Sequence, residues 1–204
     1  MRGTRNADRI DGNGGRDRIF GLRGDDALNG GLGDDRIFGS HGNDQLAGVQ
    51  GNDRLWGEQG NDLLVGDANN TGDRTSLDRL FGGSGNDTLR GGDSHDRLSG
   101  GSGNDISYGE NGRDFMSGGS GNDQQDGGSG DDTIYANVGE DVSVGGDGDD
   151  TIDGNQGSDT VFMGAGDDTF NWDPGDGSDV VDGGSGNDLI RFNGANIAEI
   201  ITLG

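Results

Sequence analysis

Apolar residues recur along this chain once every nine positions, separated mostly by glycine and small polar side chains. The segment Gly82 to Arg90 shows the pattern as GGSGNDTLR, which reads G-G-x-G-x-D-x-apolar-x. With the aspartate counted as position six, 20 nonapeptides lie between residues 3 and 191, and position eight is Ile, Leu, Val, Met or Phe in 17 of them. A fixed period of this kind is typical of solenoid proteins, in which stacked repeats complete one another's core.

Each nonapeptide is predicted to contain a tight turn and then a very short strand. Positions one to five are rich in glycine, which adopts the positive φ angles that tight turns need. Positions seven to nine form the strand, with position eight facing inward. Three polar exceptions at position eight, 18 residues apart, are Ser107, Gln125 and Ser143. They indicate either weakly packed coils with a polar inward column or a local one-residue flip of the strands, so we expect the least stable region near residues 100–144.

Two insertions interrupt the period. Residues 66–72 (GDANNTG) precede the repeat that begins at Asp73, and residues 172–173, Trp172 and Asp173, precede the single proline, Pro174. Each falls before the turn half of a repeat, so both are expected to form bulged loops.

The period fades after Arg191, and residues 192–204 are expected to form a partial C-terminal cap over the open end of the solenoid. The apolar residues of this cap are Ile197, Ile200, Ile201 and Leu203. Residues 1–204 are therefore predicted to form a single domain whose 20 repeats span residues 3–191.

Composition limits the chemistry available to such a domain. Of the 204 residues, 48 are glycine, 14 are Arg, none is Lys, and 39 are acidic, giving a net charge of −25. This charge argues against bulk electrostatic binding to nucleic acid or an anionic membrane. Residues 1–102 hold 12 Arg and 17 acidic residues (net −5), whereas residues 103–204 hold 2 Arg and 22 acidic residues (net −20). Cysteine is absent, which leaves oxygen ligands, and no stretch approaches the roughly 20 apolar residues of a membrane span.

The aspartate at position six is the strongest candidate for chemistry. A carboxylate that recurs beside flexible glycine turns forms a hard-oxygen site, and Ca²⁺ accepts six to eight carboxylate and carbonyl oxygens in irregular geometry. Mg²⁺ demands a tighter octahedron, and Zn²⁺ prefers His or Cys. The candidate metal ligands are Asp8, Asp17, Asp26, Asp35, Asp44, Asp53, Asp62, Asp78, Asp87, Asp96, Asp105, Asp114, Asp123, Asp132, Asp141, Asp150, Asp159, Asp168, Asp179 and Asp188.

In these motifs the chain resembles the RTX (repeat-in-toxin, haemolysin-type) calcium-binding family. The resemblance implies an all-β fold, a right-handed parallel β-roll with two short strands per 18-residue coil and about ten coils. It also implies calcium ions between adjacent turns, held by the position-six aspartates and by backbone carbonyls that we place at positions one and three. The carbonyls of the best-matching loops belong to Gly82, Ser84, Gly100, Ser102, Gly118, Ser120, Gly127, Ser129, Gly145, Asp147, Gly183 and Ser185.

Some loops depart from the pattern. The segment 136–140 (ANVGE) lacks the paired glycines, Ser94 replaces a glycine, and residues 73–77 contain none. Two loop edges of ten turns each leave at most 18 gaps between turns, and the irregular loops reduce the expectation to roughly 12–16 calcium ions. Family members are exported unfolded through type I secretion and fold outside the cell, so the resemblance implies an extracellular module.

The outward positions suggest a second use of the surface. One face carries an aromatic column beside an arginine column, made of Phe20, Phe38, Trp56, Phe81, Arg18, Arg36, Arg54 and Arg79. These columns either stack on one another and offset nearby aspartates, or form a recognition surface for an acidic glycan or a partner protein. A column of Asn beside Ser on one loop edge also permits an ice-binding interpretation, in which the main alternative is simple turn chemistry.

No catalytic arrangement is visible. The two histidines, His41 and His95, are predicted in loops, no H-E-x-x-H motif is present, and paired carboxylates coincide with positions five and six of the repeat. We therefore expect no enzyme activity within this chain and no nucleic-acid partner. The predicted function is that of a monomeric module which folds on binding extracellular calcium and serves the secretion, folding or stability of a secreted protein, with adhesion to a glycan or partner as the alternative.

Overall fold

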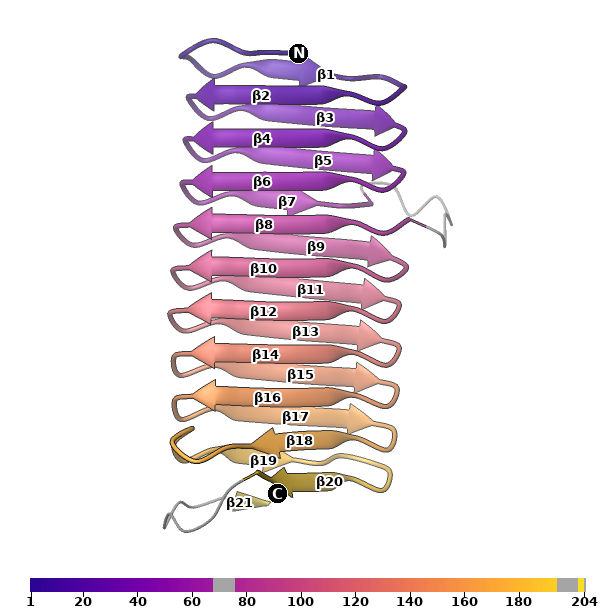
Figure 1. Ribbon diagram of the computed structural model, residues 1–204, viewed down its shortest axis with the longest axis vertical. Helices are drawn as coiled ribbons and strands as arrows, with labels where there is room; N and C mark the ends of the chain where they lie inside the picture. Colours follow the sequence, from indigo (N-terminus) through magenta and orange to yellow (C-terminus); the bar gives the residue numbers. More distant parts are fainter. Residues whose placement is uncertain (68–75, 194–201, 204) are drawn as a thin grey trace.

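The protein is a stack of parallel strands in the computed structural model, which describes residues 1–67, 76–193 and 202–203 (Figure 1). Successive strands alternate between two sheets, so each coil of 18 residues contributes one strand to each. Every pairing within the sheets is parallel, and residue i pairs with residue i+18 except across the two insertions. The predicted all-β parallel β-roll with two strands per coil is therefore confirmed.

The first sheet has 11 strands. They are β1 (Arg9–Asp11), β3 (Ala27–Leu32), β5 (Gln45–Gln50), β7 (Leu63–Val65), β9 (Thr88–Asp93), β11 (Ile106–Asn111), β13 (Gln124–Ser129), β15 (Val142–Asp147), β17 (Thr160–Ala165), β19 (Val180–Asp182) and β21 (Thr202–Leu203). The second sheet has ten. They are β2 (Arg18–Arg23), β4 (Arg36–His41), β6 (Arg54–Gln59), β8 (Arg79–Ser84), β10 (Arg97–Ser102), β12 (Phe115–Ser120), β14 (Thr133–Val138), β16 (Thr151–Gln156), β18 (Thr169–Trp172) and β20 (Leu189–Phe192).

Most strands are six residues long, which corrects the predicted three. A strand such as β10 continues from positions seven to nine into positions one to three of the next repeat. Its burial pattern has two inward positions, Leu98 at position eight and Gly100 at position one. The second inward position could not be predicted from the sequence, because glycine has no apolar side chain whose hydropathy would mark it as buried.

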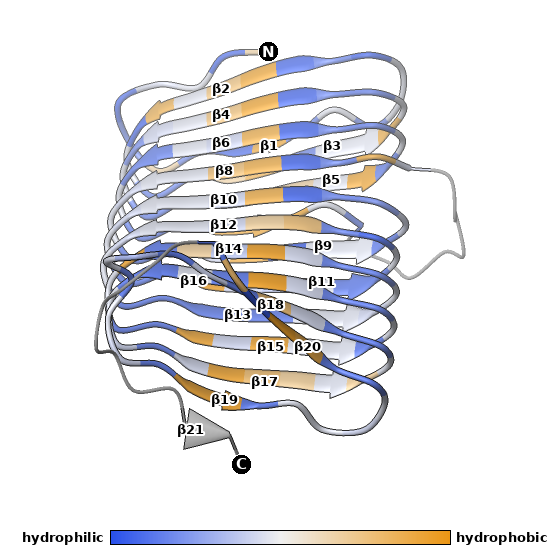
Figure 2. Cartoon of the chain, turned by 60° about the horizontal axis from the view of Figure 1, so that its bottom comes forward, coloured by the Kyte–Doolittle hydropathy of each residue, from blue (hydrophilic) through white to orange (hydrophobic). Residues whose placement is uncertain are grey.

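The core is the space between the two sheets. Position-eight residues such as Ile37, Leu55 and Leu80 are fully buried and stack in register along the roll. Figure 2 shows a hydrophobic stripe that runs across successive strands, with hydrophilic segments beside it. Burying each such side chain contributes about 1.5–3 kcal/mol, so a thin core is enough when it is repeated in every coil.

The polar column at position eight points inward. Ser107, Gln125 and Ser143 are all at most 3% exposed, and they pair in register with each other and with Leu89. The alternative of a one-residue flip is therefore wrong. Gln125 Nε2 donates to the Tyr135 carbonyl at 3.4 Å, whereas Gln125 Oε1 and Ser143 Oγ have no partner, which leaves this stretch of core under-satisfied.

The structure places the first residue of each insertion at position one of a turn rather than before it. Gly66 keeps the contacts of a position-one glycine, since a Cβ added there would lie 2.5 Å from Asp78 Oδ2 and from the Gly91 carbonyl. Trp172 likewise occupies position one, pointing inward at 5% exposure. Of the proposed cap, Leu203 lies in β21, which pairs with β19, and Ile197, Ile200 and Ile201 lie outside the described residues.

Candidate metal sites

The position-six aspartates form two buried columns, one along each loop edge of the roll. Seventeen of the 20 are at most 3% exposed, although each carries a carboxylate. The exceptions lie at the two ends of the roll, where Asp8 and Asp17 are half-buried and Asp188 is exposed. The repeat therefore places nearly every candidate ligand where a carboxylate is costly to keep ionised without a partner.

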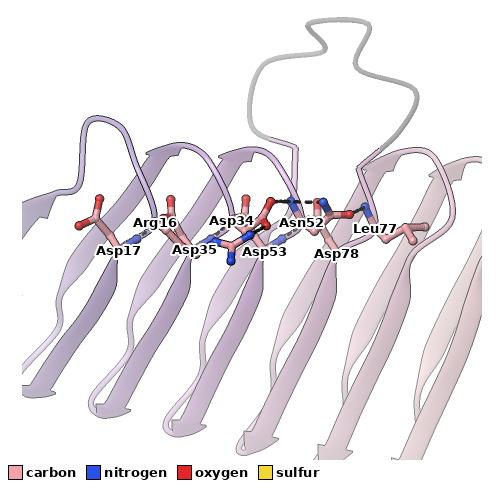
Figure 3. Close-up of polar contacts among 8 residues, drawn as sticks. All are labelled: Arg16, Asp17, Asp34, Asp35, Asn52, Asp53, Leu77 and Asp78. Atoms are coloured by element: carbon pink, nitrogen blue, oxygen red, sulfur yellow. Dashed lines mark hydrogen bonds and ion pairs between the residues drawn. The ribbon is translucent and has the colours of Figure 1, made fainter.

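From Asp26 onward, one oxygen of each position-six carboxylate accepts a backbone N–H from the preceding coil and so stabilises the stack. Asp105 Oδ1 accepts the backbone N–H of Asp87 at 2.8 Å, and Asp123 Oδ1 accepts that of Asp105 at 2.8 Å. The ladder continues across both insertions. Asp78 Oδ1 accepts the backbone N–H of Asp53 at 2.7 Å, and Asp179 Oδ1 accepts that of Asp159 at 3.0 Å. Figure 3 shows part of one column, in which successive aspartates lie in line along the loop edge. This ladder also explains why aspartate is suited to position six even before a metal is considered.

The second oxygen of these carboxylates is the unusual one. Oδ2 is buried without a hydrogen-bond partner in Asp26, Asp35, Asp44, Asp53, Asp62, Asp78, Asp87, Asp96, Asp105, Asp114, Asp123, Asp132, Asp141, Asp150, Asp159 and Asp168. Burial raises the pKa of Asp53, Asp87 and Asp123 to about 7 and that of Asp78 to about 9. A column of unpartnered oxygens whose ionised form is disfavoured is a set of sites that a cation would stabilise.

The position-one glycines bring a second oxygen to the same place. A Cβ added at Gly109 would lie 2.5 Å from Asp114 Oδ2 and 2.5 Å from the Gly127 carbonyl oxygen, so both oxygens face one spot that only glycine leaves open. The same arrangement relates Gly82 to the Gly100 carbonyl. Position-one carbonyls thus lie beside the carboxylates, as the predicted ligand set requires.

The position-three carbonyls are already hydrogen-bonded. Each accepts the amide of position four one coil earlier, as in Gly85 N–H to Ser102 O at 2.9 Å and Gly103 N–H to Ser120 O at 2.8 Å. The same bond is made to the carbonyls of Ser84, Ser129, Asp147 and Ser185. A carbonyl has two lone pairs, so one remains for a metal.

The irregular loops keep most of the backbone conformation of the regular ones. Positions two and four have positive φ in most of the described turns, and Asn137 (φ 82°) and Ser94 (φ 98°) adopt it without being glycine, whereas Gly139, at position four of the 136–140 loop, does not. Val49, a β-branched residue, is held at φ 92°, where such residues are genuine outliers. The stacked neighbours therefore impose the turn, although residues 73–75 lie outside the described residues.

Position five forms a further ladder that the sequence did not reveal. Asn61 Oδ1 accepts the backbone N–H of Asn86, and Asn86 Oδ1 accepts that of Asn104, both at 2.8 Å. On the opposite edge, Asn52 Oδ1 accepts the N–H of Leu77 at 2.9 Å (Figure 3). The asparagine column of the ice-binding interpretation is thus engaged through its oxygens in stacking the turns.

The donor set decides which ion these residues suit. Among the described residues, no three carboxylate or imidazole side chains converge on one point, so a cation would need backbone carbonyls beside the aspartates. His41, which was predicted in a loop, is the last residue of β4, and its Nδ1 lies 2.7 Å from Gln59 Oε1 at the end of β6. His95 lies in a turn, where its Nδ1 accepts the Arg113 N–H at 2.7 Å. Unpartnered carboxylate oxygens beside carbonyls and glycine fit a hard, irregularly coordinated cation such as Ca²⁺.

This fold and its turns define a class of protein: parallel β-solenoids with oxygen-rich, glycine-rich turns between stacked coils. A family model described as the RTX calcium-binding nonapeptide repeat matches residues 2–37, 38–71, 77–107, 108–142, 135–170 and 175–196. These segments cover most of the chain, and the protein belongs to the RTX calcium-binding repeat family, whose nonapeptides bind multiple calcium ions. A search of curated proteins gave no match. None of the described residues forms a helix long and apolar enough to cross a membrane.

Proposed function

We propose that this chain is a calcium-dependent folding module of an extracellular protein. The single observation that carries the proposal is the pair of buried aspartate columns in which, from Asp26 to Asp168, Oδ1 is hydrogen-bonded and Oδ2 has no partner. Calcium supplies positive charge and accepts irregular oxygen ligands. The position-six carboxylates and the carbonyls at positions one and three hold it, and the roughly 12–16 occupied turns follow from the number of regular loops.

The mechanism is thermodynamic linkage. The columns exist only when the coils are stacked, so a cation that binds the folded coil and not the unfolded chain adds its binding free energy to folding. At low calcium, 39 acidic residues against 14 basic ones oppose compaction. Millimolar calcium outside a cell suits weak modular sites of this kind, and a chain that stays loose until export would serve secretion, folding and stability of a larger protein.

Calcium titration followed by far-UV circular dichroism tests the proposal. In EDTA the spectrum should resemble that of an unfolded chain, and calcium should restore the β signal cooperatively. Asp105→Ala and Asp123→Ala should raise the calcium midpoint, whereas Asp126→Ala, on the outward face of β13, should raise it much less. Equal β signal with and without calcium would refute the linkage, and equal shifts in all three variants would indicate general charge rather than ligation.

One observation supports the alternative of a partner-binding face. Arg18, Arg36, Arg54, Arg79 and Arg97 lie directly opposite one another in register, and none makes an ion pair with another described residue. Like charges directly opposite in a sheet are destabilising, although Arg18 is partly accommodated over the Phe20 and Phe38 rings at 5.1 and 5.6 Å. The column is therefore suited to an anionic partner.

A further inference from the structure

The aromatic column of the ten-stranded sheet ends abruptly in the middle of the roll. The rings of Phe20, Phe38, Trp56 and Phe81 stack with centroid distances of 4.8, 4.5 and 5.7 Å and interplanar angles of at most 11°. The residue that follows Phe81 in register is Ser99. Stacking therefore covers the facing sides of the rings and leaves the outer faces of the two end rings, Phe20 and Phe81, without a stacked ring.

A cavity of about 400 Å³ lies at this break. We call it the notch and define it by Arg79, Phe81, Arg97, Ser99, Phe115 and Ser117. Two serine rungs separate Phe81 from the next ring of the column, Tyr135, which packs against Phe115 at a centroid distance of 5.6 Å. Phe81 and Phe115 are 37% and 42% exposed, so the notch has two apolar walls open to solvent.

The notch also carries two arginines without ion pairs among the described residues, and two serine hydroxyl groups. Arg79 and Arg97 are register partners without an ion pair among the described residues, and the Arg97 guanidinium carbon lies 6.0 Å from the Phe115 ring centroid. Ser117 Oγ accepts a hydrogen bond from Asn137 Nδ2 at 3.1 Å. An aromatic wall, two guanidinium groups and two serine hydroxyls thus converge on one space.

We propose that the notch binds one ring of an acidic saccharide. The apolar C–H face of a hexuronate ring would stack on Phe81, its carboxylate would accept hydrogen bonds from Arg79 and Arg97, and its hydroxyl groups would meet Ser99 and Ser117. Single-stranded nucleic acid fits less well, because it needs several open ring faces for successive bases and the net charge of −25 opposes it. The site needs only the folded β-roll and does not include the calcium-facing carboxylates.

Isothermal titration calorimetry with trigalacturonate in saturating calcium tests the notch. Wild type should bind the trisaccharide, and its methyl ester, which lacks the charge, should bind at least about tenfold more weakly. Ser99→Phe should extend the aromatic column into the notch and abolish binding, and Arg97→Gln should weaken binding about tenfold. The matched control is Arg9→Gln, an exposed position-seven arginine in β1 of the opposite sheet, which should leave affinity within about twofold of wild type.

Absence of binding by wild type, equal affinity for the ester, or full binding by Ser99→Phe would each overturn the proposal. Binding at the notch of an acidic peptide but not of the saccharide would also overturn it. The calcium-induced β signal of every variant is recorded first. A variant that folds in calcium but does not bind tests the notch alone, whereas a wild type that is insensitive to calcium refutes the folding mechanism and leaves the notch standing.

Discussion

Replacing Asp123 with Asn should change stability in opposite directions with and without calcium. Asp123 is 1% exposed, its Oδ1 accepts the Asp105 N–H at 2.8 Å, and its Oδ2 has no partner. Asparagine has the same shape and keeps the Oδ1 acceptor, but it removes the buried charge. Its Nδ2 would face the Ala136 carbonyl, which lies with Asp123 Oδ2 beside Gly118. The substitution therefore separates the role of the side chain in stacking from its role in ligation.

The magnitude follows from burial. Burial raises the pKa of Asp123 from 3.8 to about 7, so keeping this carboxylate ionised at about pH 8 without a cation costs on the order of 4 kcal/mol. Asp123→Asn should recover up to about that amount in the calcium-free protein. In calcium the variant loses a charged ligand, and the calcium midpoint should rise about tenfold.

Urea unfolding followed by circular dichroism measures both effects, in saturating calcium and in EDTA with sucrose, which favours the compact state. Asp126→Asn, on the outward face of β13, is the matched control and should move neither transition by more than about 1 kcal/mol. If Asp123→Asn destabilised the protein in both conditions, Oδ2 would not be an unpartnered charge. If it stabilised the protein in both, Asp123 would not be a calcium ligand.

Three further predictions concern pH, the polar core and backbone strain. In EDTA, lowering the pH from about 8 to about 5 should increase the β signal. Burial raises the pKa of Asp53 and Asp87 from 3.8 to about 7. Protonation of these carboxyl groups therefore stabilises the fold fully below pH 3.8, and this stabilisation is lost as the pH rises through about 7. A β signal that does not change with pH would contradict this prediction. The double variant Gln125→Leu/Ser143→Val should raise the unfolding free energy in calcium by about 1–3 kcal/mol, because it removes buried oxygens that have no partner. The reverse change Leu89→Gln should lower the unfolding free energy. Unchanged stability in the double variant would show that Gln125 Oε1 and Ser143 Oγ are hydrogen-bonded after all. Val49→Gly should raise the melting temperature. Removing a β-branched residue from φ 92° relieves about 1–3 kcal/mol of backbone strain, which exceeds the entropic cost of glycine of about 0.5–1 kcal/mol. The control is Val65→Gly in β7, which should lower the melting temperature.

Much of the fold could be predicted because the nine-residue period is visible directly in the sequence. The position-eight residues gave the core, and the 18-residue coil gave a register that the pairing of Phe38 with Trp56 reproduces. Hydropathy could not show that position one is also buried, because most repeats have glycine there and glycine has no side chain to mark an inward position. Only the departures from glycine, Ala136, Met163 and Trp172, carry that signal, and all three are buried.

The residue types of the candidate sites could be predicted from the sequence, but the contacts that each side chain makes could not. Recurring aspartates beside glycine indicated oxygen ligands, yet nothing in the sequence separates the two oxygens of one carboxylate, which have different roles in the buried aspartates from Asp26 to Asp168. The insertion near Gly66 was placed too early, because a glycine followed by Asp67 fits either the end of one repeat or the start of the next. The recognition surface was expected along the whole aromatic column, whereas stacking covers all its inner faces and leaves unstacked faces at its two ends, Phe20 and Phe81, of which Phe81 borders a cavity.

Apart from the two insertions, paired strands are 18 residues apart, and this spacing has a mechanical consequence. Each coil contacts only the coil before it and the coil after it, so tension applied to the two chain ends should peel coils away one at a time. Each event would release 18 residues, or about 60 Å of extended chain. A force–extension trace should therefore show evenly spaced steps, and the calcium concentration should set the force at which each step occurs without changing its length.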